Sequence, residues 1–342
     1  MTTKDAATSF RWIWAGIGLA GVFLSSFMIG RFPVAPHHVV AILASQLLPI
    51  DPSWTTEAAT IVLKVRLPRI LSAMLVGAAL SSSGAAFQGV FRNPMVSPDI
   101  LGVAAGAGFG AALAILAGMS GLGIQAAAFV GGLIAVTATY AIGSWRGSQG
   151  DGVLVMVLAG IIVGTVFSAG ISLTKYVADP ANTLPAITFW LMGSLASVTS
   201  RDLCLVALPI LSGLCLLNLL RWRLNLLSFG DDEARALGVD VRKIRLAVIV
   251  AATLMTASSV AISGVIGLVG LVVPHLARML VGPNYRILLP TCALLGAGFL
   301  LAVDDLARSL AAGEIPLGIL TSLLGAPFFL ALLFNIRKGW AT

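Results

Sequence analysis

Residues 153–174 read VLVMVLAGIIVGTVFSAGISLT and contain no Asp, Glu, Lys or Arg. A helix of about 20 apolar residues crosses the hydrocarbon core of a bilayer, so this stretch predicts a membrane-spanning helix. Eight other stretches lack the same four residue types, near 12–30, 70–90, 100–117, 122–144, 203–220, 246–263, 287–303 and 315–335, and a ninth, near 265–281, contains only Arg278 close to its end. The chain is therefore predicted to be an all-α polytopic membrane protein with about ten transmembrane helices in a single domain spanning residues 1–342.

The composition agrees with this prediction. Of 342 residues, 58% are hydrophobic and only 10% are charged, whereas soluble domains carry about a quarter charged residues. The long apolar runs exclude a disordered chain, a disulfide scaffold and a membrane β-barrel. The shorter apolar segment 186–198 is predicted to be a partly buried helix ahead of the sixth span. The first span is predicted to be retained, because Trp12 and Trp14 suit an interfacial anchor and no signal cleavage site follows.

The distribution of positive charge predicts the orientation. With the N-terminus inside, 14 of the 21 Lys and Arg residues fall on inner segments and seven on outer ones. Both termini are therefore predicted to be cytoplasmic, and the basic balance indicates orientation and not nucleic-acid binding. Lys64, Arg66 and Arg69 cluster on the outer side against this rule. Such a cluster suits docking of an acidic partner or snorkelling of long side chains at a helix start.

The predicted spans lack the groups that ion-coupled carriers need. No Asp, Glu, Lys or Arg falls within their cores, and Asp304 and Asp305 lie at the outer end of a span. No GxxxxGK[ST] motif is present, so the chain is not expected to hydrolyse ATP. The isolated cysteines and three histidines do not form metal-ligand patterns. A conduit driven by another subunit is favoured, with an ion-coupled secondary transporter or a non-transporting scaffold as alternatives.

Glycines recur at spacings that suit close helix packing. Gly102, Gly106 and Gly110 are four residues apart, as are Gly160 and Gly164. Another group, Gly264, Gly267 and Gly270, follows an apolar span and predicts packing or a sharp re-entrant turn.

The most polar stretch lies between the sixth and seventh spans and includes SFGDDEARALGVDVRKIR at 228–245. Asp231 or Asp232 is expected to cap a short helix, and Gly238 fits a left-handed position after it. Glu233 lies in the first turn, where a negative side chain stabilises the helix by interacting with its dipole. A second short helix is predicted from Asp240. This cytoplasmic segment, about 228–242, is predicted to dock into a partner.

Several motifs resemble a known family. RLPR at 66–69, followed by LSAMLVGAALSSSGAAFQGVFRNPMVSPDILGV at 71–103, is similar to the defining segment of FecCD-type permeases, which import iron chelates and cobalamin. The segment at 228–240 resembles their coupling loop. GVIGLVGLVVPHLARMLVG at 264–282 and EIPLGILTSLLGAPFF at 314–329 resemble their two C-terminal signatures.

The resemblance implies the BtuC-like fold of a type II ABC importer permease in the bacterial inner membrane. Two permease copies, as a homodimer, would surround a central pathway, with two ATPase subunits beneath and a periplasmic binding protein above. The ATPase subunits would use ATP and Mg, and this chain would bind no cofactor.

The resemblance also implies roles for particular residues. Docking of the binding protein falls to Arg66, Arg69 and Arg308, although Asp304 and Asp305 could instead pair internally with Arg308. ATPase coupling is assigned to Asp231, Asp232, Glu233, Arg235, Leu237 and Gly238. The gate is assigned to Asn93, Met95, Gly152, Val153 and Leu154, where Gly-Val-Leu replaces the Ser or Thr of some relatives. The expected cargo is a ferric siderophore, then haem, with a corrinoid or a molybdate-type oxyanion as alternatives.

Overall fold

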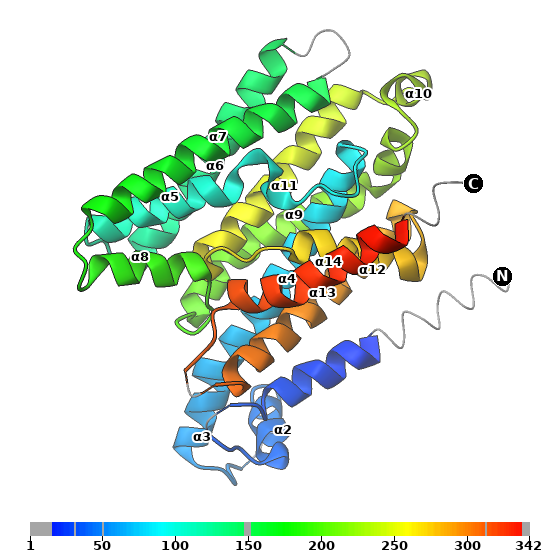
Figure 1. The fold of residues 1–342 in the computed structure, drawn as a ribbon. Helices are drawn as coiled ribbons and strands as arrows, with labels where there is room; N and C mark the ends of the chain where they lie inside the picture. The colour runs from blue at the N-terminus through cyan, green and yellow to red at the C-terminus, as the bar shows by residue number, and fades with distance from the viewer. Residues whose placement is uncertain (1–15, 31, 50, 147–151, 312, 337–342) are drawn as a thin grey trace, which may run out of the picture.

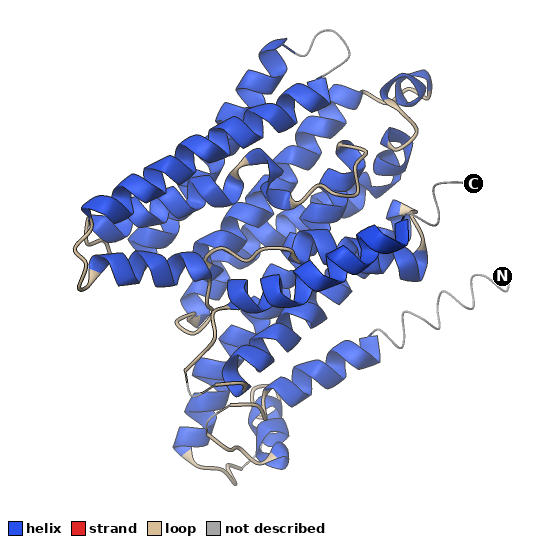
Figure 2. Ribbon diagram, in the orientation of Figure 1, coloured by secondary structure: helices blue, strands red, loops and turns tan. Residues whose placement is uncertain are grey.

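The structure is a computed structural model that describes residues 16–30, 32–49, 51–146, 152–311 and 313–336. Within these residues the fold consists of helices and loops, with no strand (Figure 2). In chain order the helices are Gly16–Ser26, α2 (Pro36–Ala44), α3 (Thr56–Thr60), the π-helix η1 (Ile61–Arg66), α4 (Leu67–Val90), the 3₁₀-helix η2 (Pro98–Leu101), α5 (Val103–Leu116), α6 (Gly121–Arg146), α7 (Gly152–Val177), α8 (Thr183–Met192), α9 (Ser200–Leu227), α10 (Asp231–Ala236), α11 (Val241–Ser263), α12 (Val269–Val281), α13 (Tyr285–Ser309) and α14 (Leu317–Ile336).

Six helical segments are long and apolar enough to cross a membrane. They are Thr56–Val90, Gly121–Ser144, Val153–Val177, Ser200–Leu227, Val241–Ser263 and Tyr285–Ser309. The other four predicted spans coincide with shorter apolar helices, Gly16–Ser26, Val103–Leu116, Val269–Val281 and Leu317–Ala331. The all-α prediction is thus confirmed for the described residues, whereas the number of about ten crossings stays a prediction. Residues 12–15 of the first predicted span and both chain termini lie outside the described residues.

The short segment ahead of the sixth span also forms a helix. α8 begins at Thr183, three residues before the predicted start, and ends at Met192, so residues 193–198 of the predicted helix are not helical; Gly193, with φ +78°, follows it. Pro185, just before the predicted segment, lies within the first turn of this helix. Proline is tolerated there because the first-turn N–H groups have no partner within the helix.

α4 is the centre of the bundle and packs against α9, α11, α12 and α13. Within the membrane-crossing segment Thr56–Val90, which includes α4, 83% of an apolar stretch of 18 residues is buried inside the chain. The corresponding share for α7 is 22%. Small residues allow direct backbone contact, since a Cβ on Gly77 would lie 2.1 Å from the carbonyl oxygen of Gly296. The predicted packing role of Gly106 and Gly160 is confirmed, because a Cβ on either would overlap a carbonyl oxygen of a neighbouring segment.

A sharp break joins α11 to α12. Gly264 and Leu268 both have positive φ, +66° and +65°, and the intervening residues form no regular helix. Gly270 then packs directly on α4, where a Cβ would lie 2.7 Å from the carbonyl oxygen of Leu80. The turn predicted from the three glycines is therefore present, and it places the start of α12 against the middle of α4.

The candidate sites lie at opposite ends of the bundle. Figure 1 shows α10 and the end of α14 on one side, with α2, α3 and α8 on the other. The outer arginines lie at the α2–α3 end, and the predicted coupling segment lies at the α10 end. The long helices connect the two sites.

Candidate functional site

The structure brings the three predicted docking arginines to one place. Arg66 ends η1, Arg69 lies in the first turn of α4, and Arg308 lies in the last turn of α13. Together with Glu314 they line an outer arginine pocket of about 250 Å³. The remaining lining residues are Gly30, Phe32, Ile61 and Val65.

Arg69 is held by two carboxylates. Its Nε donates to both oxygens of Asp304 at 3.0 and 3.1 Å, and its Nη groups donate to Glu314 at 2.8 and 2.9 Å. Asp304 is fully buried, whereas a third of the Glu314 side chain is exposed. Glu314 therefore forms the solvent-facing part of this ion pair network.

Arg308 is paired internally, which is the alternative that the sequence left open beside a docking role. Its Nε lies 3.2 Å from Asp304, and its Nη2 donates to Asp305. Its Nη1 donates to the carbonyl of Ile29 at 2.8 Å, and Asp305 accepts the hydroxyl of Ser26 at 2.6 Å. Arg308 therefore connects the end of α13 to the chain that follows the first helix.

Arg66 differs from the other two arginines in its partners. Its Nη groups donate to the backbone carbonyls of Phe27 and Phe32, and no carboxylate within the described residues pairs with it. The pocket region contains three guanidinium groups and three carboxylates, so its formal charges balance. Arg66 is only 4% exposed, so an incoming carboxylate would reach its guanidinium through the pocket and in competition with these two carbonyl groups.

At the other end of the bundle, α10 forms as predicted but starts differently. Gly230 is its N-cap with φ +135°, so the prediction that Asp231 or Asp232 caps the helix is wrong. Asp231 instead pairs with Arg245 at 2.9 Å, and Asp232 pairs with Arg235 at 3.0 Å. Glycine readily adopts the positive φ that starts this helix.

The end of α10 agrees with the prediction, but the next element does not. Gly238 follows the helix with φ +81°, as expected for a left-handed residue at that position. The predicted second short helix is the first turn of α11, which continues without a break to Ser263. Asp240 caps α11 by accepting the N–H of Lys243 at 3.1 Å, and this hydrogen bond lowers the pKa of Asp240.

The coupling segment presents apolar side chains to solvent. Phe229 is 71% exposed and Leu237 is 62% exposed, on either side of the charged turn of α10. Ala234 is fully buried and anchors α10 to the bundle. Exposed aromatic and aliphatic groups beside charged groups form a surface suited to protein docking.

The predicted gate residues lie on the surface of the single chain. Asn93 accepts the N–H of Met95 at 2.8 Å in the turn after α4, and Met95 is 44% exposed. Gly152 starts α7, where Val153 packs partly against the core and Leu154 is 57% exposed. A constriction built from these residues would require a second surface opposite them.

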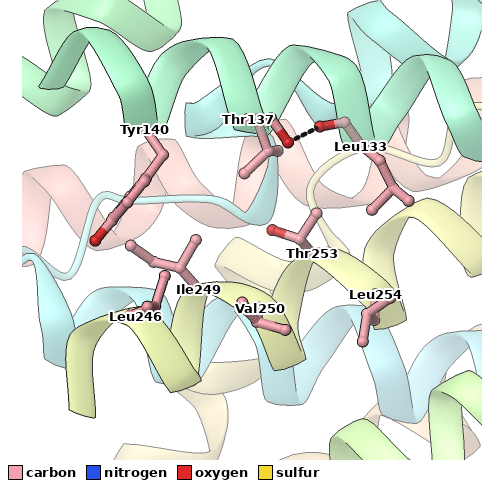
Figure 3. A pocket seen from close by; sticks show the side chains of 9 residues that line it. Leu133, Thr137, Tyr140, Leu246, Ile249, Val250, Thr253 and Leu254 are labelled. Atoms are coloured by element: carbon pink, nitrogen blue, oxygen red, sulfur yellow. Dashed lines mark hydrogen bonds between the residues drawn. The ribbon is translucent and has the colours of Figure 1, made fainter. Parts of the chain in front are cut away.

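Two apolar pockets on the single chain have linings that are not suited to binding a charged cargo. One, of about 170 Å³, lies between α6 and α11 and is lined by apolar side chains with Thr137, Tyr140 and Thr253 (Figure 3). The other, of about 400 Å³, lies between the first helix and α12 and α13. Neither contains a charged side chain. Ligand pockets usually enclose about 300–1,000 Å³ with a few placed polar groups, so the smaller pocket is too small and the larger one lacks polar groups.

The whole described bundle matches one protein family. Residues 18–335 match the FecCD transport family. The chain belongs to this family. It is therefore a permease subunit of an ABC importer, a non-catalytic transport component that spans the membrane several times.

Relatives within the family carry different cargoes. The chain is 43% identical to the molybdate import system permease protein MolB of Haemophilus influenzae over 92% of each chain. It is 42% identical to the hemin transport system permease protein HmuU of Yersinia pestis, over 81% of this chain and 84% of the relative. A solved structure described as an inward-facing conformation of a metal-chelate type ABC transporter superposes with a TM-score of 0.84 at 40% identity, over 94% of this chain and 98% of that one.

The sequence did not reveal how the outer arginines are satisfied. Pairing of Asp304 with Arg308 was an alternative considered from the sequence, but its pairing with Arg69, 235 residues away, was missed. Glu314 was missed as well. One feature of the sequence could have indicated these pairs: Asp304 and Glu314 lie on either side of the outer loop that begins just after Arg308.

Proposed function

We propose that this chain is the membrane subunit of an ATP-driven importer whose cargo is a metal chelate, with a ferric siderophore first and haem second. It receives cargo from a periplasmic binding protein and releases it into the cytoplasm by alternating access. About ten crossings of the bacterial inner membrane, with both termini in the cytoplasm, complete this arrangement.

The observation that carries the proposal is the placement of two docking features at opposite ends of one bundle. The outer arginine pocket is lined by Arg66, a buried guanidinium without a carboxylate partner among the described residues, and α10 is flanked by the exposed side chains of Phe229 and Leu237. An importer driven by another subunit needs one contact for the protein that delivers cargo and another for the ATPase. The long helices between them provide a physical link between the two events.

The proposed complex contains two copies of this chain, two ATPase subunits that use ATP and Mg, and one binding protein. The gate formed by Asn93, Met95 and residues 152–154 would close between the two copies, since Met95 and Leu154 are exposed on a single chain. No cofactor is proposed for this chain. A homodimer is proposed because one chain supplies all of these features.

A molybdate-type oxyanion is a second candidate cargo, favoured by the similarity to MolB over 92% of each chain. A corrinoid is a further alternative within the family, since a cobalamin import system permease protein of Halobacterium salinarum is 40% identical over 86% of this chain.

The test is transport in proteoliposomes that contain the complete complex. Ferric siderophores, haem, cobalamin and molybdate are supplied separately with the cognate binding protein, and ATP-dependent uptake is measured. Uptake of a ferric siderophore is expected, with no uptake when the ATPase carries an inactivating substitution. Uptake that persists without ATP hydrolysis and follows a proton or sodium gradient would overturn the proposal in favour of an ion-coupled carrier.

A further inference from the structure

One carboxylate lies at a depth that the sequence pattern does not reveal. After α4 ends at Val90, the chain turns and re-enters the bundle as η2, which contains Asp99. A Cβ on Gly270 would lie 2.4 Å from Pro98, and a Cβ on Gly84 would lie 1.8 Å from the carbonyl oxygen of Gly270. The residue before Asp99 therefore lies at the level of Gly84, six residues or about 9 Å before the end of α4.

A second helix gives the same depth independently. A Cβ on Gly160 would lie 2.1 Å from the carbonyl oxygen of Ile100, the residue after Asp99. Gly160 is eight residues, or about 12 Å, from the start of α7, whose 26 residues extend about 39 Å. With about 30 Å of hydrocarbon centred on α7, η2 lies roughly 7 Å inside the inner boundary.

Asp99 is nevertheless exposed on the surface of the single chain. Its Oδ1 accepts the N–H of Ala104 at 2.7 Å and caps the start of α5. No ion pair joins Asp99 to a basic side chain among the described residues. Acidic residues at membrane depth face the protein interior or a water-filled cavity, because lipid cannot solvate them. The surface around Asp99 should therefore face water and not lipid.

Neighbouring exposed residues extend this surface. Ile161 is 57% exposed and directly follows Gly160, which contacts Ile100. Leu154 lies seven residues earlier, on the same side of α7 and two turns nearer its start. Met95, four residues before Asp99, is exposed in the turn that leads into η2. These side chains are apolar. Arg92, exposed in the same turn as Met95, lies toward α10, since a Cβ on Gly230 would lie 3.7 Å from its Nη1. Asp99 therefore supplies the charge beside Ile161, on the part of the wall that lies deeper in the bundle.

We propose that Asp99 lines the inner half of the translocation pathway and makes it favour neutral or cationic cargo over oxyanions. The inference rests on the proposed importer function and refines its cargo class. A carboxylate in a narrow apolar passage repels an anion more strongly than it would in bulk water, because the low-dielectric walls confine the field. A chelate without negative charge would pass without this barrier.

The experiment measures the local potential directly and requires no cargo. In the complete complex, Cys204→Ser and Cys215→Ser remove the exposed thiols, and Ile161→Cys adds a reporter. Inside-out vesicles without nucleotide are treated with a cationic reagent, trimethylammonium-ethyl methanethiosulfonate, or an anionic one, sulfonatoethyl methanethiosulfonate. The ratio of the two modification rates reports the potential at residue 161.

Asp99→Asn should reduce the cation-to-anion rate ratio by about fivefold at low salt. Unit charges about 8 Å apart in water attract or repel by the same Coulomb energy, so the carboxylate speeds the cationic reagent and slows the anionic one, and both effects enter the ratio. Asp99→Glu should restore the ratio, and high salt should diminish the difference. Asp51→Asn, which removes an exposed carboxylate in the loop between α2 and α3 at the other end of the bundle, is the control and should leave the ratio unchanged. The amide of Asp99→Asn can still accept the N–H of Ala104, so the cap is retained.

Two results would overturn the inference. A reporter that reacts at the same rate ratio with Asp99 and with Asp99→Asn would show that the carboxylate does not face the pathway. A reporter that reacts with neither reagent would show that lipid or the second copy covers this surface. Because the assay uses neither ATP nor cargo, its failure is distinguishable from a failure of the importer proposal.

Discussion

The substitution Asp304→Asn tests whether the buried carboxylate holds the outer arginines together. Asp304 is fully buried and contacts both Arg69 and Arg308, within a region where three guanidinium groups balance three carboxylates. The amide leaves one buried positive charge uncompensated. Breaking a buried ion pair costs about 3–5 kcal/mol, and the retained amide oxygen places the expected loss near about 3 kcal/mol.

The loss should appear as a lower apparent melting temperature of the purified protein in detergent. At about 2 °C per kcal/mol for a chain of this size, a decrease of about 6 °C is expected. Size-exclusion chromatography with fluorescence detection after a temperature series measures the fraction that remains monodisperse. Asp51→Asn, which removes an exposed carboxylate, is the control and should leave the midpoint unchanged.

A double substitution separates charge balance from simple loss of contact. Asp304→Asn with Arg308→Gln restores the balance and should recover part of the lost stability, since the uncompensated charge is removed. A midpoint for Asp304→Asn within about 1 °C of the unmodified protein would refute the reasoning, because the arginines would then not depend on this carboxylate. A double variant less stable than the sum of its single changes would also contradict it.

Three further expectations concern docking, coupling and packing. Glu314→Gln should free Arg69 for an incoming carboxylate and strengthen binding-protein docking about threefold to tenfold, more at low salt, in surface plasmon resonance; equal affinity at both salts would contradict this. Phe229→Ala with Leu237→Ala should reduce ATPase co-purification at least tenfold, since truncating interface anchors costs about 1–2 kcal/mol each, and recovery at the original ratio would place the contact elsewhere. Gly84→Ala should destabilise the bundle by about 1–3 kcal/mol, measured as a lower melting midpoint, because its Cβ would lie 1.8 Å from a backbone oxygen; an unchanged midpoint would exclude that contact.

The helical pattern was readable from sequence because hydropathy is a local property. Each predicted span overlaps an apolar helix of the structure, since a run without charged residues can be satisfied only by a buried or lipid-facing helix. The left-handed Gly238 after α10 was predicted for a similar reason, because helix termination depends on one residue's backbone.

Features that depend on contacts between distant segments were not predicted. The pairing of Arg69 with Glu314 joins residues 245 positions apart, and spacing within one helix cannot reveal it. The start of α10 was missed because Asp231 is drawn into an ion pair with Arg245 of another helix. Asp99 was counted as outside the spans because re-entry of the chain after α4 leaves no hydropathy signal.

The glycine contacts of α4 have a consequence for motion during transport. The backbones of α4 and α13 touch at Gly77 and Gly296, and those of α4 and α12 touch at Gly84 and Gly270. Sliding at either contact would drive backbone atoms into one another, so these three helices should move as one rigid body. In α7 only 22% of an apolar stretch of 18 residues is buried inside the chain. α7 can therefore tilt with a smaller loss of contacts to the other helices. Spin-label distances within the α4–α12–α13 group should therefore stay constant when nucleotide binds, while distances from that group to α7 change.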